Sequence, residues 1–466
     1  MIDKIINGAN DILYSYVLII LLVLGGIYFT VRTKGAQFRL LGQQFKAVTE
    51  KAEKGGVSSF QALVVSTASR VGTGNIIGVA TALCVGGFGS VFWMWVIAII
   101  GAASAFVEST LAQIYKKKGK EGCYGGPAYY IEAATKKKGL AILFSVFLVL
   151  TYGIGFNMLA SYNLQSTFAT YGFYNAQITP WIIGGVIAVL VGICLIGGGK
   201  RIVSVTSFLV PIMGVIYILV ALVISLLNIS ALPAIFKQIF SEAFDIQAIF
   251  GGFGGSCVMY GIKRGLFSNE AGVGSAPNAS ASAEVSHPAK QGLVQVLSVF
   301  IDTLFVCTAT AFLCMTSGVT PPTASGQAAA YVQSAIAVSL GQVGPVFITV
   351  AMILFAFTTL LGNLYYVDKT INYLLGKEPT KVFKNIYRIV ASLVIFAGAG
   401  LSADLLWGIA DVMMAGMTII NMPVIIYLGR YAIRALNDYE KQLKQGGNIT
   451  FKKRDIGLTD ETDYWN

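Results

Sequence analysis

Long apolar runs separated by short polar or basic stretches dominate the sequence. A helix needs about 20 mostly apolar residues to cross the hydrocarbon core of a bilayer. The runs therefore predict about eleven membrane-spanning helices, at residues 14–31, 58–85, 88–115, 140–170, 179–197, 202–228, 248–276, 291–317, 344–373, 386–402 and 404–430. Residues 232–244 also have apolar positions at helical spacing, but Lys237 and Glu242 lie between them, which indicates an interfacial helix. The pattern predicts an all-α polytopic membrane protein.

The second predicted span contains residues that a transmembrane helix normally avoids. Gly72, Gly74 and Gly78 lie at mid-span together with Arg70 and Asn75. Glycine costs a helix interior about 1 kcal/mol relative to alanine, and a charge at membrane depth costs roughly 2.5–3.5 kcal/mol. Irregular backbone at that depth is tolerated only against protein or a water-filled cavity. We therefore expect a broken helix with a binding site at its midpoint.

A similar segment occurs in the seventh predicted span. RVGTGNIIGVATA (70–82) aligns without gaps on RGLFSNEAGVGSA (264–276), with Arg, Asn, Gly, Val and the last Ala in common. The segments lie five crossings apart, so they run antiparallel, and the ten helices from the second onward form five-plus-five inverted repeats with a site at their interface. The expected organisation is a peripheral helix and basic loop at 1–57, a first repeat at 58–228, an external interfacial helix at 229–247, a second repeat at 248–433 and a cytoplasmic tail at 434–466.

The position of the second break has two interpretations. The alignment places it at residues 266–269. Lys263 beside Arg264 could instead mark a cytoplasmic helix end, which would move the break to the glycine-rich residues 251–256.

Composition and charge support a membrane transporter. Hydrophobic residues make up 55% of the chain and charged residues 12%, about half of the usual ~25% in soluble domains. Lysine and arginine account for the net charge of +11 and cluster in alternate loops and after residue 430. The positive-inside rule then predicts a plasma-membrane protein with its N-terminus outside and its C-terminus in the cytoplasm. The last thirty residues are polar and predict a helix end followed by a mobile tail.

The sequence offers little for other function classes. It has no GxxxxGK(S/T) motif and no CxxC spacing, and its single histidine, His287, lies in a Ser-His-Pro loop. We therefore expect no nucleotide, no nucleic acid, no metal cofactor and no enzyme activity. A channel would need a continuous pore lined by rings of carbonyls or charges, whereas this chain has two unlike halves.

The first break suits a zwitterion together with a cation. Amides at the start of a half-helix attract anions, and carbonyls at the end of the other attract cations. Thr358 and Thr359 lie mid-span in a later helix and offer hard oxygen ligands for a small cation. Mid-helix threonines also commonly bond back to their own helix. Both interpretations remain open.

Intramembrane charges need partners or water. We consider two gate-like ion pairs, and plain structural pairing is an equal alternative. The candidate pairs are Arg70 with Asp368 or Glu270, and Arg264 with Asp404 or Asp411. Residues that could form the wall of the pocket, or simply pack between helices, are Tyr152, Phe156, Asn157, Trp407 and Met414.

Three stretches resemble the alanine or glycine:cation symporter family: GGFGSVFWMW (86–95), GTGNIIG (72–78) and RGLFSNEAG (264–272). The resemblance covers essentially the whole chain. It implies sodium-coupled uptake of alanine or glycine by a LeuT-type fold, with Na⁺ as the coupling ion. A proton-coupled carrier or a channel for a small solute is the alternative.

The resemblance also implies site residues. Thr73 and Gly74 would supply carboxylate-binding amides, with Asn75 and Gly78 nearby. Phe267, Ser268 and Asn269 occupy the aligned positions of the second segment. Sodium would bind the carbonyls of Ala68 and Val71 and the hydroxyls of Thr358 and Thr359.

Overall fold

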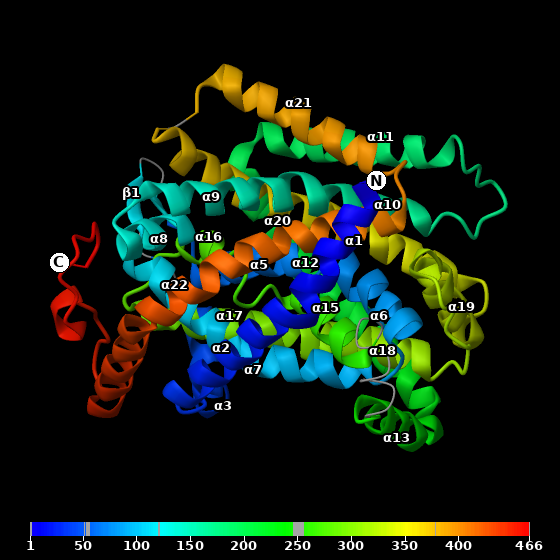
Figure 1. Ribbon diagram of the computed structural model, residues 1–466, viewed down its shortest axis with the longest axis horizontal. Coiled ribbons are helices and arrows are strands. Elements are labelled where there is room, and N and C mark those ends of the chain that lie inside the picture. Colours follow the sequence, from blue (N-terminus) through cyan, green and yellow to red (C-terminus); the bar gives the residue numbers. More distant parts are fainter. Residues whose placement is uncertain are drawn as a thin grey trace.

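Helices account for nearly all regular structure in the computed structural model of the chain (Figure 1). The structure describes residues 2–50, 52, 56–119, 122–245, 256–377 and 379–465. Within them, seven helices are long and apolar enough to cross a membrane, and one bent pair raises the number to eight. The protein is a multi-pass α-helical membrane protein.

The long helices follow the predicted spans closely. They are α7 (Ser90–Ile114), α9–η3–α10 (Lys138–Leu148, Val149–Gly155, Phe156–Ser166), α11 (Thr179–Ile196), α12 (Gly198–Leu227), α17–η6–α18 (Pro288–Val299, Phe300–Cys307, Thr308–Met315), α20 (Val343–Leu375) and α22 (Ala403–Gln445). The bent pair joins α5 (Ser59–Arg70) to η2–α6 (Gly74–Gly78, Val79–Gly86) at an angle of 50°.

Three predicted spans contain helices that are shorter or more charged. These are α2 (Leu18–Arg32), which continues α1 (Ile2–Ile12) and η1 (Leu13–Val17), then α15 (Cys257–Asn269), and α21 (Lys381–Gly398). The number of about eleven crossings, and the five-plus-five repeat, therefore stay predictions.

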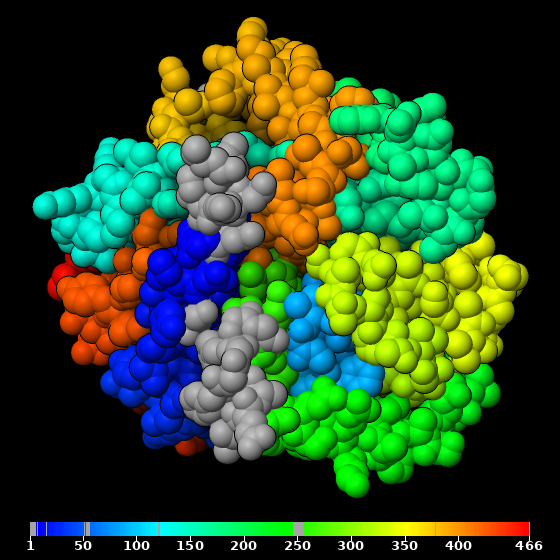
Figure 2. Space-filling view, turned by 45° about the vertical axis from the view of Figure 1, so that its right-hand side comes forward, coloured from blue at the N-terminus to red at the C-terminus, as the bar shows by residue number. Residues whose placement is uncertain are grey.

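The arrangement in Figure 1 places helices distant in sequence side by side. α1 and α2 cross the face of the bundle next to α22, and α11 packs against α21 at one edge. Inside the bundle α7 packs extensively against α15 and α17, and α5 packs against α12 and α20. Figure 2 shows one face of the bundle, where residues of α13 (Leu232–Ala243) and α19 (Ala328–Leu340) flank the light-blue α6 region.

Several elements were not predicted. α19 lies between the predicted spans at 291–317 and 344–373, where the sequence predicted no helix. α13, by contrast, coincides with the helix predicted at residues 232–244. Short helices α3 (Ala36–Arg39), α4 (Leu41–Thr49), α8 (Pro127–Thr135) and α16 (Pro277–Ser280) lie in connecting segments. Strands β1 (Lys117–Gly119) and β2 (Gly122–Tyr124) pair antiparallel, with Lys117 opposite Tyr124.

The expectation of a mobile C-terminal tail is wrong for residues 446–465. This segment contains the short helix η8 (Lys453–Ile456) and folds back onto the bundle. Phe451 and Trp465 are buried, and Trp465 Nε1 donates to the Gln113 carbonyl at 2.7 Å. Asp463 pairs with Lys117 at 3.0 Å. The sequence did not indicate this packing, because the segment is mostly polar and its few apolar residues follow no helical or strand spacing.

Candidate functional site

The first predicted break is present. α5 ends at Arg70, Val71 is extended (φ −76°, ψ 90°), and η2 begins at Gly74. The whole stretch from residue 62 to 84 is buried in protein, as irregular backbone at membrane depth requires. η2 is a π-helical segment, a form that often occurs at functional sites.

Asn75 connects the two sides of this break to other helices. Its Oδ1 accepts from the Gly72 amide at 2.7 Å. Its Nδ2 donates to Asp302 Oδ1 at 2.7 Å and to Ser268 Oγ at 3.0 Å. Ser268 Oγ in turn donates to Asp302 Oδ2 at 2.7 Å. One amide therefore links the first break, α15 and η6.

The second helix is interrupted directly after Asn269. Glu270 has φ +53°, and Gly272 and Gly274 have φ +86° and +90°, so the chain leaves α15 through left-handed conformations. A left-handed backbone conformation is strained for a residue such as Glu270. The Glu270 carboxylate accepts hydrogen bonds from Ser69 Oγ at 3.2 Å and from Ser275 Oγ at 2.6 Å. Residues 251–255 of the alternative break lie outside the described residues.

The two threonines of α20 have different surroundings. Thr358 Oγ1 donates back to its own helix, to the carbonyls of Leu354 at 3.0 Å and Phe355 at 3.2 Å. Thr359 Oγ1 is buried and has no hydrogen-bond partner among the described residues. A Cβ placed on Gly72 would overlap this oxygen. The Thr359 hydroxyl therefore faces the first break at close range, near the last turn of α5, which contains Ala68, and near Val71, which follows that helix.

Aromatic rings surround the start of η2. The centre of the Phe267 ring lies 4.5 Å from that of Phe156 and 4.8 Å from that of Trp407, and the Tyr152 ring lies 4.9 Å from Phe156, tilted by 53°. A Cβ on Gly74 would come within 2.7 Å of Phe267.

Other predicted residues lie around these rings. Met414 is buried in α22. Asn157 Oδ1 accepts from Asn363 of α20 at 3.0 Å, while Thr73 Oγ1 accepts from Asn163 Nδ2 at 3.2 Å. A Cβ on Gly78 would lie 3.4 Å from Trp407.

One of the two predicted charge groups is a tight ion pair. Arg264 and Lys263 approach the same oxygen, Asp411 Oδ2, at 2.7 Å and 2.9 Å. The guanidinium also lies 4.0 Å above the Trp407 ring. Asp404 accepts instead from Ser325 Oγ at 2.5 Å.

Arg70 forms no ion pair with either predicted partner. Its Nη1 donates to Gln295 Oε1 of α17 at 3.0 Å, and no acid lies within 4.0 Å of it among the described residues. Glu270 is buried within its electrostatic range, whereas Asp368 lines a cavity at the far end of α20. Which side chains meet depends on how each helix is rotated about its own axis. That rotation cannot be read from the residue types along the chain.

Comparison with known proteins places the chain in a family. Residues 1–453 match the sequence model of the sodium:alanine symporter family. The protein belongs to this family.

Relatives of the symporter match it over nearly their whole length. The amino-acid carrier protein AlsT of Bacillus subtilis (strain 168) is 42% identical over 464 residues, covering 99% of this chain and 97% of AlsT. The probable sodium/glutamine symporter GlnT of the same organism is 42% identical, covering 97% and 94%. The sodium/alanine symporter AgcS of Methanococcus maripaludis is 36% identical, covering 94% and 98%.

A solved structure of a Na⁺-coupled sialic acid symporter, substrate-bound and outward-open, matches with a TM-score of 0.49 and 13% identity, covering 88% of this chain and 85% of that one.

The symporter contains two buried acids that the sequence analysis missed, Asp302 and Glu108. Glu108 of α7 accepts from the Gly272 amide at 3.3 Å and from Asn421 Nδ2 at 3.0 Å, so it holds the second interruption. Each is the sole acid of its apolar run. An intramembrane ionisable residue is a functional candidate by default, and applying that rule to every span would have found both.

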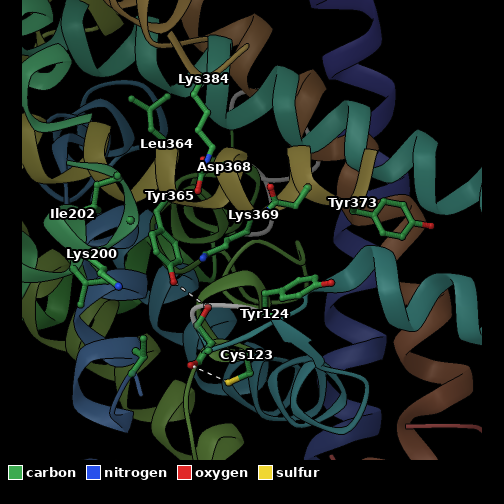
Figure 3. A pocket seen from close by; sticks show the side chains of 18 of the residues that line it. Cys123, Tyr124, Lys200, Ile202, Leu364, Tyr365, Asp368, Lys369, Tyr373 and Lys384 are labelled. Atoms are coloured by element: carbon green, nitrogen blue, oxygen red, sulfur yellow. Dashed lines mark hydrogen bonds between the residues drawn. The ribbon is translucent and has the colours of Figure 1, made fainter. Parts of the chain in front are cut away.

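A cavity of about 1410 Å³ opens at the end of the symporter where lysines gather (Figure 3). It lies between the β1–β2 hairpin, the start of α12, the end of α20 and the start of α21. Tyr365 donates to Ser282 Oγ across it at 2.9 Å. Its charged lining residues are Lys118, Glu132, Lys138, Lys200, Asp368, Lys369, Lys377, Lys384 and Arg388. We call this cavity the basic vestibule.

Proposed function

We propose that the symporter moves a small neutral amino acid, alanine or glycine, together with Na⁺ by alternating access. The observation that supports this most directly is the buried break between α5 and η2. There the Thr359 hydroxyl has no hydrogen-bond partner among the described residues, and the ring of Phe267 lies against Gly74. The family's description names both sodium and alanine, and AgcS carries the same substrate in its name.

The substrate would bind at the start of η2. The amides of Thr73 and Gly74 begin a half-helix, whose partial positive charge favours a carboxylate. The rings of Phe267 and Trp407 lie close to Gly74 and Gly78, respectively. The proposed site therefore has room there only for a substrate with a small side chain. The remaining proposed contacts are Asn75, Tyr152, Phe156, Asn157, Ser268, Asn269 and Met414.

Sodium would bind at the end of α5. The carbonyls of Ala68 and Val71 lie at the partly negative end of that helix, and the Thr359 hydroxyl faces the break with no hydrogen-bond partner in the part of the chain that the structure describes. Oxygen ligands of this kind suit a small hard cation. Thr358 would have to release its bonds to Leu354 and Phe355 in order to join them.

The gates and the orientation form part of the same proposal. Arg264 and Asp411 would close one side of the site, and Arg70 near Glu270 the other; plain structural pairing is the alternative. Lysines line the basic vestibule, so by the positive-inside rule it faces the cytoplasm, with the N-terminus outside. The two five-helix repeats, over residues 58–228 and 248–433, would be the two halves that move against each other during alternating access.

Uptake into proteoliposomes tests the proposal. Labelled alanine, glycine and glutamine are offered under sodium, lithium or proton gradients; glutamine is included because GlnT carries it in its name. One charge moving down 100 mV supplies about 2.3 kcal/mol, or roughly 50-fold concentration of a neutral zwitterion. We expect saturable, sodium-dependent accumulation of alanine or glycine. Flux without sodium, or at rates far above those of a carrier, would overturn the proposal in favour of a proton-coupled carrier or a channel.

A further inference from the structure

The C-terminal segment, residues 446–465, packs onto the end of the bundle where the basic vestibule opens. It lies beside the β1–β2 hairpin (Figure 1), and the Lys453 amide donates to the Trp465 carbonyl at 2.8 Å, which closes its last part into a loop. The rings of Phe451 and Trp465 are buried, with their centres 5.3 Å apart. Burial of these two rings holds the segment on the bundle.

Acidic residues of the C-terminal segment pair with lysines at this end of the bundle. Asp463 pairs with Lys117 and accepts from the Lys118 amide at 3.1 Å. Asp460 pairs with Lys136 at 2.7 Å. These side chains are partly exposed, and exposed ion pairs contribute little stability each. Their main effect is to orient the C-terminal segment on the hairpin.

Lys116 is a buried cation that the C-terminal segment covers. Its ammonium nitrogen lies 4.6 Å from the centre of the Tyr464 ring and 5.0 Å from that of Trp465. It donates to the Ala283 carbonyl at 3.1 Å, and no carboxylate oxygen lies within 4.0 Å of it in the part of the chain that the structure describes. A buried charge depends on the few polar groups and aromatic faces that it touches. Removal of the two rings would let water compete with Ala283 for the ammonium.

Gln113, at the end of α7, is held by the same cover. Its backbone carbonyl accepts from the Trp465 indole. Its side-chain nitrogen donates to the carbonyls of Ser280 at 2.5 Å and Ala283 at 2.8 Å. The Ala283 carbonyl thus has two donors, from Gln113 and Lys116, and the C-terminal segment contacts both donor residues. It therefore helps to fix residues 280–284.

Residues 280–284 also touch the two helices that form the proposed sodium site. The Glu284 amide donates to the Val57 carbonyl at 2.9 Å, just before α5 begins at Ser59. Ser282 Oγ accepts from Tyr365 of α20 across the basic vestibule (Figure 3). Alternating access moves one group of helices against the other. Any widening of the vestibule between α5 and α20 would have to displace residues 280–284.

We propose that the C-terminal segment is an autoinhibitory latch on transport. By covering Lys116 and Gln113 it holds residues 280–284 against Val57 and Tyr365, and so slows the widening of the basic vestibule. The effect on uptake rests on the proposed symport, whereas the effect on residues 280–284 does not. The latch acts on the rate and not on substrate affinity, because it lies at one end of the bundle and the break at its middle.

Hydrogen exchange of the full-length protein in detergent, followed by mass spectrometry, measures the hold directly. Tyr464→Leu/Trp465→Leu removes the rings over Lys116 and should speed exchange of the Glu284 amide roughly 2- to 30-fold, the range that a cation–π contact supports. Lys116→Met keeps the apolar stem and removes the ammonium, so it should act in the same direction. The combined variant should exchange more slowly than the product of the two effects predicts, since both break one connection. Asp455→Asn, in an exposed ion pair of the same segment, should leave the exchange unchanged.

Uptake into proteoliposomes separates a latch from a structural brace. Deletion of residues 446–466 should raise the maximal rate of sodium-dependent alanine uptake, again roughly 2- to 30-fold, at an unchanged half-saturating alanine concentration. Should the deletion destabilise the protein, Lys116→Met in the full chain must show the same rise. Unchanged exchange at Glu284 in Lys116→Met and the double leucine variant, or a maximal rate that does not rise in a variant of wild-type thermal stability, would overturn the latch. If the wild type shows no sodium-dependent uptake, the symport fails, while the exchange at Glu284 still decides the latch.

Discussion

The hydroxyl of Thr359 provides the sharpest test of the sodium site. It is buried, has no hydrogen-bond partner among the residues that the structure describes, and faces the break at Gly72. Thr359→Val replaces this hydroxyl by a methyl group of similar size, so the packing of α20 against α5 is retained. The substitution removes one proposed ligand and no hydrogen bond.

The size of the effect follows from what the oxygen does. A polar contact to a charged group contributes about 1.5–3 kcal/mol, which corresponds to roughly 10- to 150-fold in the sodium concentration that gives half-maximal uptake. In the absence of sodium the variant should be at least as stable as the wild type, because a buried unsatisfied hydroxyl is itself unfavourable. Sodium-dependent uptake of alanine and thermal unfolding in detergent measure the two quantities.

Thr358→Val is the matched control. The Thr358 hydroxyl already bonds the carbonyls of Leu354 and Phe355, so its loss should change the half-maximal sodium concentration less than the loss of Thr359. Equal sodium dependence of Thr359→Val and the wild type would refute the reasoning. A larger effect of Thr358→Val would show that the ligand had been assigned to the wrong threonine.

Three further predictions concern the break, the ion pair and the single histidine. Gly72→Ala should lower the free energy of unfolding by about 1–3 kcal/mol, because the added Cβ overlaps the Thr359 hydroxyl. Unchanged thermal stability would contradict the close contact between Gly72 and Thr359. Asp411→Asn should destabilise by about 3–5 kcal/mol, since it leaves two buried cations without their carboxylate, and Asp404→Asn, at an exposed site, should have little effect in the same unfolding assay. Burial lowers the pKa of His287 to about 4, so the folded state resists a proton that the unfolded chain binds below about pH 6.5. Stability should therefore be constant above that pH and fall as the pH approaches 4, and His287→Gln should flatten this slope; identical slopes would exclude the histidine as its source.

The candidate site was partly accessible from sequence. The glycines at 72 and 74 beside Arg70 indicated a break, because their cost in an apolar helix is a local property, and the structure has the break there. Asp411 was one of two candidate partners of Arg264, and the structure selects it. Asp302 is a lone acid in an apolar run with no repeated motif around it, so no pattern of spacing in the sequence connects it to the break. The network that joins it to Asn75 and Ser268 arises only when η2, α15 and η6 meet.

The sequence by itself determined the class of protein, the approximate spans and an interruption within Gly72 to Asn75, since hydropathy and helix propensity are read from neighbours along the chain. The tertiary structure decided that Thr359 rather than Thr358 faces the break, that Arg70 turns to Gln295, and that the tail is packed. Those outcomes depend on the rotation and depth of each helix. Rotation and depth are set by the packing of side chains between segments that are distant in sequence. No pattern among neighbouring residues contains that information.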